Sequence, residues 1–304
     1  MASPPFESLD VPGRAVWLRR DAEKIGGSLP PLLAEAERLA ATIALGVHGR
    51  RRPGMGEEFW QYRQAMPGDT ASDIDWRRSG RSDTLFIRQM EWSASQTVSI
   101  WADDARSMDY KGDRADRTKA ERARLLTLAL SVLLSGAGER IALMGTRAEQ
   151  PGTGENHLRR IALTLSDPAE DRKDFGAPPR WPDRMGGQAV LLSDFMGDAD
   201  EILAGVGAVA DHGITGALVQ ILDDSEEDFP FDGRTLFQSV GGTIDFETQR
   251  ARALREAYHA RLRERRALLE DIARRTGWHL LVHHTSESPR KALLWLYTLL
   301  RGGE

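Results

Sequence analysis

The chain has 304 residues, of which 40% are hydrophobic and 29% are charged, and its formal net charge at pH 7 is −5. These proportions are typical of a globular protein with room for one large or two modest domains, and the negative balance argues against general nucleic-acid binding. Cysteine is absent, which excludes disulfides, thiolate metal sites and cysteine nucleophiles, and no apolar run reaches the roughly 18 residues that a membrane span requires.

The first predicted element is a helix. From Leu29 to Leu45 apolar residues recur at helical spacing, and Ser28 and Pro30 stand near the start, as is typical of a helix N-terminus. The stretch 50–88 that follows has no apolar period, because glycine-punctuated turns alternate there with charged side chains and tryptophans. Charged side chains rarely fill a core unless they are paired. Residues 1–94 are therefore expected to form a helix and a Gly-, Arg- and Asp-rich segment that is either an ion-pair scaffold or a recognition surface.

Local features of this segment predict turns and a dense set of charges. Gly54 and Gly56 predict a tight loop, because glycine allows backbone angles closed to other residues. Phe59 and Tyr62 indicate a short strand or turn edge, and the Pro-Gly-Asp at 67–69 predicts a turn. Forked ion pairs would then make the charged residues a clamp against the next domain or a surface for a partner. A catalytic carboxylate cluster is a third alternative, which is disfavoured because arginines lower the pKa of neighbouring acids. The charged residues concerned are Asp73, Asp75, Arg77, Arg78 and Arg81.

Strands and helices alternate along the rest of the chain. Short apolar runs predict strands at 97–102, 140–144, 189–192, 216–222 and 278–283. Longer amphipathic runs predict helices at 119–137, 156–165, 198–212, 249–276 and 289–300. This alternation is typical of an α/β fold with a doubly wound, mostly parallel sheet and helices on both faces. A strand at 85–92 is expected to pair with 97–102, and the Pro-, Asp- and Arg-rich stretch 167–187 is the candidate linker.

Two of the predicted strands end in loops that carry oxygen ligands. Asp103 and Asp104 follow the strand at 97–102, and Asp194 follows the strand at 189–192. Open sheets of this kind bind ligands beyond the carboxyl ends of their strands. These two loops are therefore the first candidates for a binding site.

A series of short motifs in the segment after the first helix resembles a known family. In chain order the motifs are Gly54-Met55-Gly56-Glu57-Glu58-Phe59, Arg63, Pro67-Gly68-Asp69, Ile74-Asp75-Trp76 and Ser79-Gly80-Arg81. They resemble the core of domain of unknown function family 58, with the spacing shifted by one residue at the doubled glutamate. The resemblance implies that residues 95–304 form a von Willebrand factor A-like domain. It also marks five residues of the segment as candidates for contact with a partner: Arg63, Asp69, Asp75, Trp76 and Arg81.

The A-like resemblance also implies a metal-ion-dependent adhesion site. Such a site uses an Asp-x-Ser-x-Ser loop, a threonine from a second loop and an aspartate after a later strand. The matching residues are Asp103, Ser107, Thr153 and Asp194, whereas Ala105 stands where the first serine is expected. Mg²⁺ keeps waters readily, so a water molecule can fill the place of the missing hydroxyl. A working Mg²⁺ site and a vestigial loop kept for structure or interaction both remain open.

The sequence supports two functional hypotheses. The resemblance implies a non-enzymatic protein-interaction module, an adaptor or partner of a MoxR-type AAA+ ATPase that acts on a protein client in remodelling or maturation. The alternative is a metal-dependent hydrolase of phosphate esters, with Asp103, Asp194 and Asp69 or Asp75 as ligands and the arginines at 77–81 holding phosphate. The first residues lack the basic start and apolar stretch of a secretory signal, so a cytoplasmic location is expected.

Two other polar stretches each allow a structural and a functional interpretation. The acidic run at 223–228, followed by Phe-Pro-Phe, is interpreted as a solvated loop or, alternatively, as a docking strip. The histidines His279, His283 and His284 are interpreted as packed or edge residues of a strand rather than metal ligands.

Overall fold

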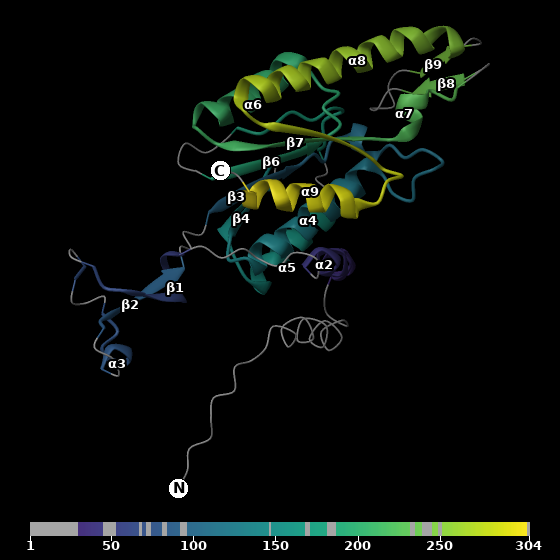
Figure 1. Cartoon of the computed structure of the whole chain (residues 1–304). Coiled ribbons are helices and arrows are strands. Elements are labelled where there is room, and N and C mark those ends of the chain that lie inside the picture. The colour runs from purple at the N-terminus through teal and green to yellow at the C-terminus, as the bar shows by residue number, and fades with distance from the viewer. Residues whose placement is uncertain are drawn as a thin grey trace. The chain divides into compact units, whose positions relative to one another are not determined.

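The computed structural model describes twelve ranges of the chain (Figure 1): 30–44, 53–66, 69–70, 74–80, 84–91, 96–145, 147–167, 171–180, 187–231, 235–238, 245–248 and 251–302. The chain forms two compact units. The smaller unit comprises residues 47–96, and the larger comprises residues 1–46 together with 97–304.

The larger unit is built around a six-stranded sheet with the strand order β10-β7-β6-β3-β4-β5. Five strands run parallel, and β5 at one edge runs antiparallel to β4. The predicted fold class, an α/β fold with a mostly parallel sheet, is confirmed, and all five strands predicted after residue 95 are present. The strands are β3 (Thr97–Ala102), β4 (Arg140–Met144), β5 (Glu149–Gly152), β6 (Gln188–Ser193), β7 (Thr215–Leu222) and β10 (His279–His284).

Helices cover both faces of this sheet (Figure 1). One face carries α6 (Ala199–Asp211) and α8 (Ala251–Thr276). The other carries α4 (Lys119–Gly136), α5 (Glu155–Ser166) and α9 (Pro289–Gly302), against which α2 (Pro31–Ala44) packs. None of the helices in the ranges given above combines the length and the apolar character needed to cross a membrane.

The start of α4 is fixed by a capping box. Thr118 Oγ1 accepts a hydrogen bond from the backbone N–H of Glu121 (3.1 Å), and Glu121 Oε2 accepts one from the backbone N–H of Thr118 (2.9 Å). These reciprocal bonds satisfy donors that a helix start leaves unpaired. Lys119 is consequently held in the first turn of α4, where its side chain reaches the carboxyl edge of the sheet.

The smaller unit is a strand pair with a short helix. β1 (Pro53–Gln64) pairs antiparallel with β2 (Phe86–Glu91), and α3 (Trp76–Ser79) lies between them in the chain. The tight loop predicted at 54–56 is wrong, because these residues belong to β1, where the register shifts between Gly54 and Phe59. The shift accommodates the glycines within a strand rather than in a turn.

Several other elements differ from the prediction. The strand predicted at 85–92 does not pair with 97–102, because β2 pairs with β1 while β3 lies between β4 and β6. β5 and five further short elements were not predicted: α3, the 3₁₀ turn η2 (Arg106–Asp109), α7 (Asp224–Asp228), β8 (Thr235–Gln238) and β9 (Asp245–Thr248).

The division into units also differs from the predicted boundary at residue 94. The first helix was expected to belong with the segment that follows it, but α2 packs against α4 and α9 of the larger unit. Leu33 and Ala36 of α2 are fully buried, and Glu35 forms an ion pair with Arg117 at 2.8 Å. The apolar face of α2 therefore completes the outer layer of the larger unit.

Leu33→Ala should lower the free energy of unfolding by about 2–5 kcal/mol, because it leaves a cavity at a fully buried position of α2. The matched control is Leu163→Ala on α5, where the side chain is 59% exposed and the expected change is within about 0.5 kcal/mol. Urea unfolding of both variants beside the wild type measures the difference. Equally small losses would show that α2 unfolds independently of the larger unit.

Candidate functional site

Three buried aspartates stand at the carboxyl edge of the larger unit's sheet. Asp103, Asp194 and Asp223 follow the last residues of β3, β6 and β7, and each is at most 3% exposed. Parallel strands end at the same edge, so the fold gathers residues that are far apart in the chain. Buried carboxylates are costly unless they are paired or hydrogen-bonded, so the partners of each aspartate define what this edge can do.

Asp103 is bound within its own loop and by the next strand. Its Oδ1 accepts a hydrogen bond from the backbone N–H of Ala105 (2.9 Å), and its Oδ2 accepts one from the hydroxyl of Ser193 (2.6 Å). Gly176 covers the carboxylate so closely that a Cβ there would lie 2.1 Å from Oδ1. Burial raises the pKa of Asp103 to about 6, although the two hydrogen bonds oppose the shift.

The segment 171–180, which was expected to be part of a linker, closes over this loop. The backbone N–H groups of Arg106 and Ser107 donate to two carbonyls of the segment, both at 2.9 Å. The guanidinium of Arg172 binds both carboxylate oxygens of Asp109, at 2.9 and 2.7 Å. The segment is therefore a structural part of the site.

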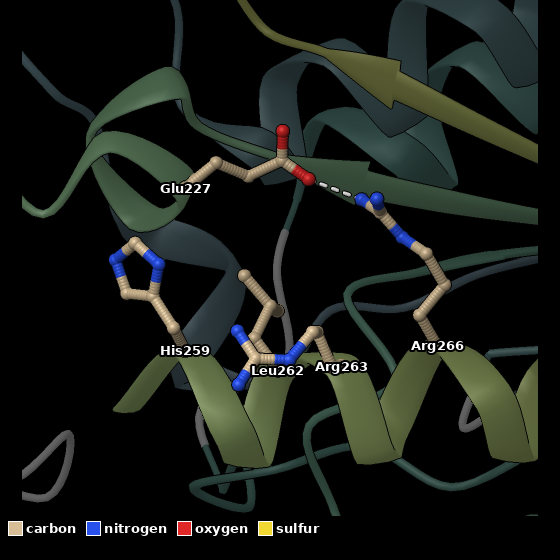
Figure 2. A pocket seen from close by; sticks show the side chains of 5 residues that line it. All are labelled: Glu227, His259, Leu262, Arg263 and Arg266. Atoms are coloured by element: carbon tan, nitrogen blue, oxygen red, sulfur yellow. Dashed lines mark hydrogen bonds and ion pairs between the residues drawn. The ribbon is translucent and has the colours of Figure 1, made fainter. Parts of the chain in front are cut away.

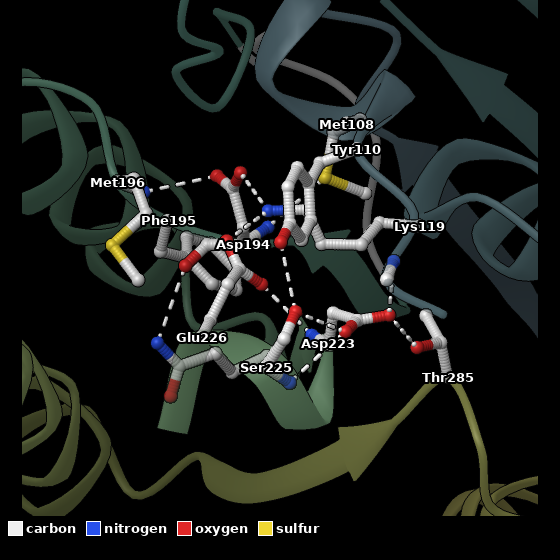
Figure 3. A network of polar contacts seen from close by, with 12 residues as sticks. Met108, Tyr110, Lys119, Asp194, Phe195, Met196, Asp223, Ser225, Glu226 and Thr285 are labelled. Carbon is white, nitrogen blue, oxygen red and sulfur yellow. Dashed lines mark hydrogen bonds and ion pairs between the residues drawn. The ribbon is translucent and has the colours of Figure 1, made fainter. Parts of the chain in front are cut away.

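A lysine ammonium lies between two carboxylates at the same edge (Figure 3). Lys119 Nζ donates to Oδ2 of Asp194 (2.9 Å) and to Oε1 of Glu226 (2.7 Å), and the lysine side chain is only 2% exposed. Burial opposes the charge, but the two carboxylates outweigh it and raise the pKa of Lys119 above its usual value. The ring of Tyr110 adds a further contact, with its centroid 5.7 Å from Nζ. The ammonium therefore stays charged at neutral pH.

Asp223 ties three further segments to this edge. Its Oδ2 accepts hydrogen bonds from the backbone N–H of Gly112 (2.9 Å) and the hydroxyl of Thr285 (2.7 Å), and its Oδ1 accepts one from the hydroxyl of Ser225 (2.6 Å). Burial would raise the pKa of Asp223, but these hydrogen bonds outweigh it and hold the pKa below its usual value. The backbone N–H of Asp223 also donates to Glu226 Oε2 (2.8 Å), which joins this network to the lysine ion pairs.

Three of the four predicted metal residues lie at this edge, and the fourth does not. Asp103 and Asp194 are described above, and Ser107 lies in the loop after β3, where its buried Oγ has no hydrogen-bond partner within the described ranges. Thr153 follows β5, which runs antiparallel and ends beside the start of β4. The exposed Thr153 therefore lies at the opposite edge of the sheet, and its assignment to the metal site is wrong.

The residues at the carboxyl edge do not fit a Mg²⁺ ion. Mg²⁺ needs six oxygens in near-octahedral geometry, whereas both oxygens of Asp103 and both of Asp194 already accept hydrogen bonds from the protein. Ala105 supplies no side-chain oxygen, and its carbonyl accepts from the backbone N–H of Met108. Two unit charges of one sign about 4 Å apart repel by about 4 kcal/mol at an effective dielectric constant of about 20, so the ammonium opposes a cation beside it. In the part of the chain that the structure describes, no group of three or more His, Asp or Glu is placed to hold a metal ion.

Lys119, Asp223 and Glu226 are site residues that were not predicted from sequence. Lys119 is the first residue of a predicted helix and carries no further signal in the sequence, and Glu226 lies in the acidic run at 223–228, whose plain interpretation is a solvated loop. The signal in the sequence was a capping box at each helix start. Lys119 is the first residue of α4, which begins with one, and Glu226 is the third residue of α7, where it bonds back to the backbone of Asp223. A capping box fixes the backbone of a helix start but does not tell which side chains of that turn become buried.

The candidates in the smaller unit include a tight ion pair. The guanidinium of Arg63 donates to both carboxylate oxygens of Asp69, at 2.7 and 2.6 Å. Hydrogen bonds from Arg63 and the backbone of Met66 lower the pKa of Asp69 to about 2. This pair closes the turn after β1, while Arg81 lies outside the described residues.

An exposed tryptophan begins α3. Asp75 caps this helix, because its Oδ1 accepts a hydrogen bond from the backbone N–H of Arg78 (3.0 Å) and its Oδ2 accepts one from the hydroxyl of Tyr62 (3.0 Å). The Arg78 guanidinium lies over the Tyr62 ring, 4.4 Å from its centroid. Trp76 is 61% exposed. The unit thus presents a large apolar ring on a turn whose backbone is fixed by several contacts.

A pocket of about 230 Å³ opens between α7 and α8 (Figure 2). Its lining residues are Glu227, His259, Leu262, Arg263 and Arg266. The Arg266 guanidinium forms an ion pair with Glu227 across the pocket, so these two charges compensate each other. Glu227 belongs to the acidic run at 223–228, but the pocket contains none of the predicted metal or partner-contact residues and none of the three buried aspartates.

Asp103 should make the protein less stable as pH rises from about 4 to about 6. Its pKa is about 6 in the folded protein against an ordinary value of 3.8, so the folded state keeps a proton that the unfolded state releases, and stability falls through this window. A shift of about two units corresponds to roughly 3 kcal/mol at most. Asp103→Asn, which cannot ionise, should flatten this part of the profile.

Urea unfolding at a series of pH values measures this effect. The control is Asp211→Asn at the exposed end of α6, which should follow the wild-type profile. If the Asp103→Asn and wild-type curves run parallel between pH values of about 4 and about 6, the raised pKa of Asp103 is contradicted.

Comparison with known proteins places the chain among relatives of similar length. An uncharacterized protein of Mycobacterium tuberculosis (strain ATCC 25618 / H37Rv), Rv1480, is 27% identical over 295 residues, covering 92% of this chain and 89% of the relative. The uncharacterized protein Mb1516 of Mycobacterium bovis (strain ATCC BAA-935 / AF2122/97) matches with the same values.

Three solved structures show weaker similarity. The conserved hypothetical protein BatB from Bacteroides thetaiotaomicron gives a TM-score of 0.42 at 11% identity, covering 69% of this chain and 100% of that chain. An aerotolerance-related membrane protein from Bacteroides fragilis NCTC 9343 gives 0.38 at 14% identity (67% and 99% covered), and the SpRpn10 VWA domain gives 0.34 at 9% identity (66% and 94% covered).

The family model described as "Protein of unknown function DUF58" matches residues 61–268. This match spans more than half of the chain and includes β3, β6 and β7 with the aspartates that follow them. The protein therefore belongs to the DUF58 family.

Proposed function

We propose that this DUF58 protein is a non-enzymatic protein-interaction module that acts as an adaptor or partner of a MoxR-type AAA+ ATPase, in the remodelling or maturation of a client protein. The choice of an ATPase partner follows from the family resemblance of the motifs in the smaller unit. The observation that carries the interaction proposal is the exposed indole of Trp76 on a firmly held turn.

Large apolar side chains are exposed in the smaller unit. Trp76, Met66 and Leu85 are 61%, 67% and 44% exposed. The backbone N–H of Ala65 donates to the carbonyl of Leu85 (2.9 Å), so Met66 and Leu85 lie on neighbouring segments. Among exposed apolar side chains, tryptophan is the type that is enriched among the residues that dominate binding energy at interfaces. The exposure supports a protein partner for this unit.

The turn that carries Trp76 is organised before any partner binds. Asp75 fixes the helix start, Tyr62 holds Asp75, and Arg78 lies over the Tyr62 ring. Association costs less free energy when the contacting side chains are already ordered. This rigidity supports a recognition role for Trp76, with Asp75, Tyr62 and Arg78 in positioning roles.

The hydrolase alternative requires carboxylates that are available to a metal ion or substrate. Asp69 is bound by Arg63, and Asp75 by the backbone of α3 and by Tyr62. The buried aspartates of the larger unit have partners of their own, as described above. The geometry therefore favours the interaction module over the hydrolase.

Trp76→Ala in the full chain should weaken the complex with the MoxR-type ATPase of the same genome. Truncation of a tryptophan at the centre of an interface costs about 2 kcal/mol or more, which corresponds to a loss of about 30-fold in affinity. The control is Leu203→Ala on α6, where a comparably exposed leucine (42%) lies in the larger unit. Co-purification followed by titration of the purified partners measures both.

The two parts of this proposal fail in different ways. If the wild-type chain forms no complex with the ATPase, the partner is wrong. If the complex forms and Trp76→Ala binds as tightly as Leu203→Ala, the partner stands and the surface is wrong.

A further inference from the structure

Lys119 connects three segments that are distant in the chain. It begins α4, whereas its partners Asp194 and Glu226 lie 75 and 107 residues further on, after β6 and in α7. The remaining oxygen of each carboxylate is bound as well: Asp194 Oδ1 accepts from the backbone N–H of Met196 (3.0 Å), and Glu226 Oε2 accepts from that of Asp223 (2.8 Å). The charges of this cluster are thus met entirely by the protein.

The ammonium is bound to a carboxylate that the family resemblance assigns to a metal ion. Lys119 Nζ is 2.9 Å from Asp194 Oδ2, and the two side chains are 2% and 1% exposed. A metal ion that bound Asp194 would compete with this ammonium and leave the buried lysine charge with only Glu226 as a partner, which is unfavourable. Figure 3 shows the lysine reaching into the group of carboxylates from α4.

We propose that the carboxyl edge of the sheet carries its own cation, the ammonium of Lys119, in place of a divalent metal ion, and is complete without metal. This inference does not depend on the proposed ATPase partner. Removal of the ammonium would free the two oxygens that it binds, Oδ2 of Asp194 and Oε1 of Glu226, and would open space for water beside them. Mg²⁺ is commonly held by one or two carboxylates together with several waters. Shortening Lys119 should therefore create a metal site that the wild type lacks.

The test is calorimetric titration of Mg²⁺ and Mn²⁺ into the full chain, together with the thermal unfolding midpoint with and without each ion. The wild type should show neither saturable binding nor a change of midpoint. Lys119→Ala should bind saturably, and saturating metal should raise its midpoint by about 5 °C or more. Lys119→Met is the matched control, because its side chain fills the space of the lysine stem without charge or an oxygen ligand, and it should not respond.

Saturable binding of either ion to the wild type, weakened by Asp194→Asn, would overturn the proposal, and the wild-type titration requires no variant to fold. A folded Lys119→Ala protein that binds neither ion would also overturn it. A Lys119→Ala chain that folds only with Mn²⁺ present supports the proposal, whereas one that fails to fold with or without Mn²⁺ contradicts it. Circular dichroism distinguishes these last two outcomes.

Discussion

The ion pairs of Lys119 with Asp194 and Glu226 hold the carboxyl edge of the sheet together. An ammonium and two carboxylates share a site that solvent hardly reaches, and removing one partner from such a buried pair costs about 3–5 kcal/mol because the other charge is left uncompensated. Through Glu226 the cluster continues to Asp223 and from there to the loops at Gly112 and Thr285. The loops at this edge are therefore held by charges that compensate one another, and the loss of any one of the three side chains leaves another buried charge with one partner fewer.

The two units differ in where their charged side chains and their aromatic side chain Trp76 lie. In the larger unit, carboxylates and a lysine are buried and accept or donate hydrogen bonds, and Gly176 packs directly against the carboxylate of Asp103. In the smaller unit, the charged residues Asp75 and Arg78 hold the backbone, while the indole of Trp76 faces solvent. This contrast supports the proposed binding surface on the smaller unit.

Local sequence patterns predicted the layers of the fold well and its contacts poorly. The apolar run that forms β6 and the capped, amphipathic start of α4 are properties of consecutive residues, so they could be found without a structure. β5 has only four residues, including a proline and a glycine, and gives no strand signal. The edge at which Thr153 lies depends on the direction of that strand. The partners of Lys119 are set by the order of strands in the sheet, which no local spacing encodes.

The chain separation between Lys119 and its partners has a consequence for how the protein folds. Spans of 75 and 107 residues must close before the ammonium meets Asp194 and Glu226, and contacts of such high sequence separation form against a large loss of chain entropy. Until β6 and α7 are in place, hydration is the better environment for these charges. We expect the three side chains to lose their water late, so that the edge of the sheet closes as one of the last cooperative events on the way to the native state.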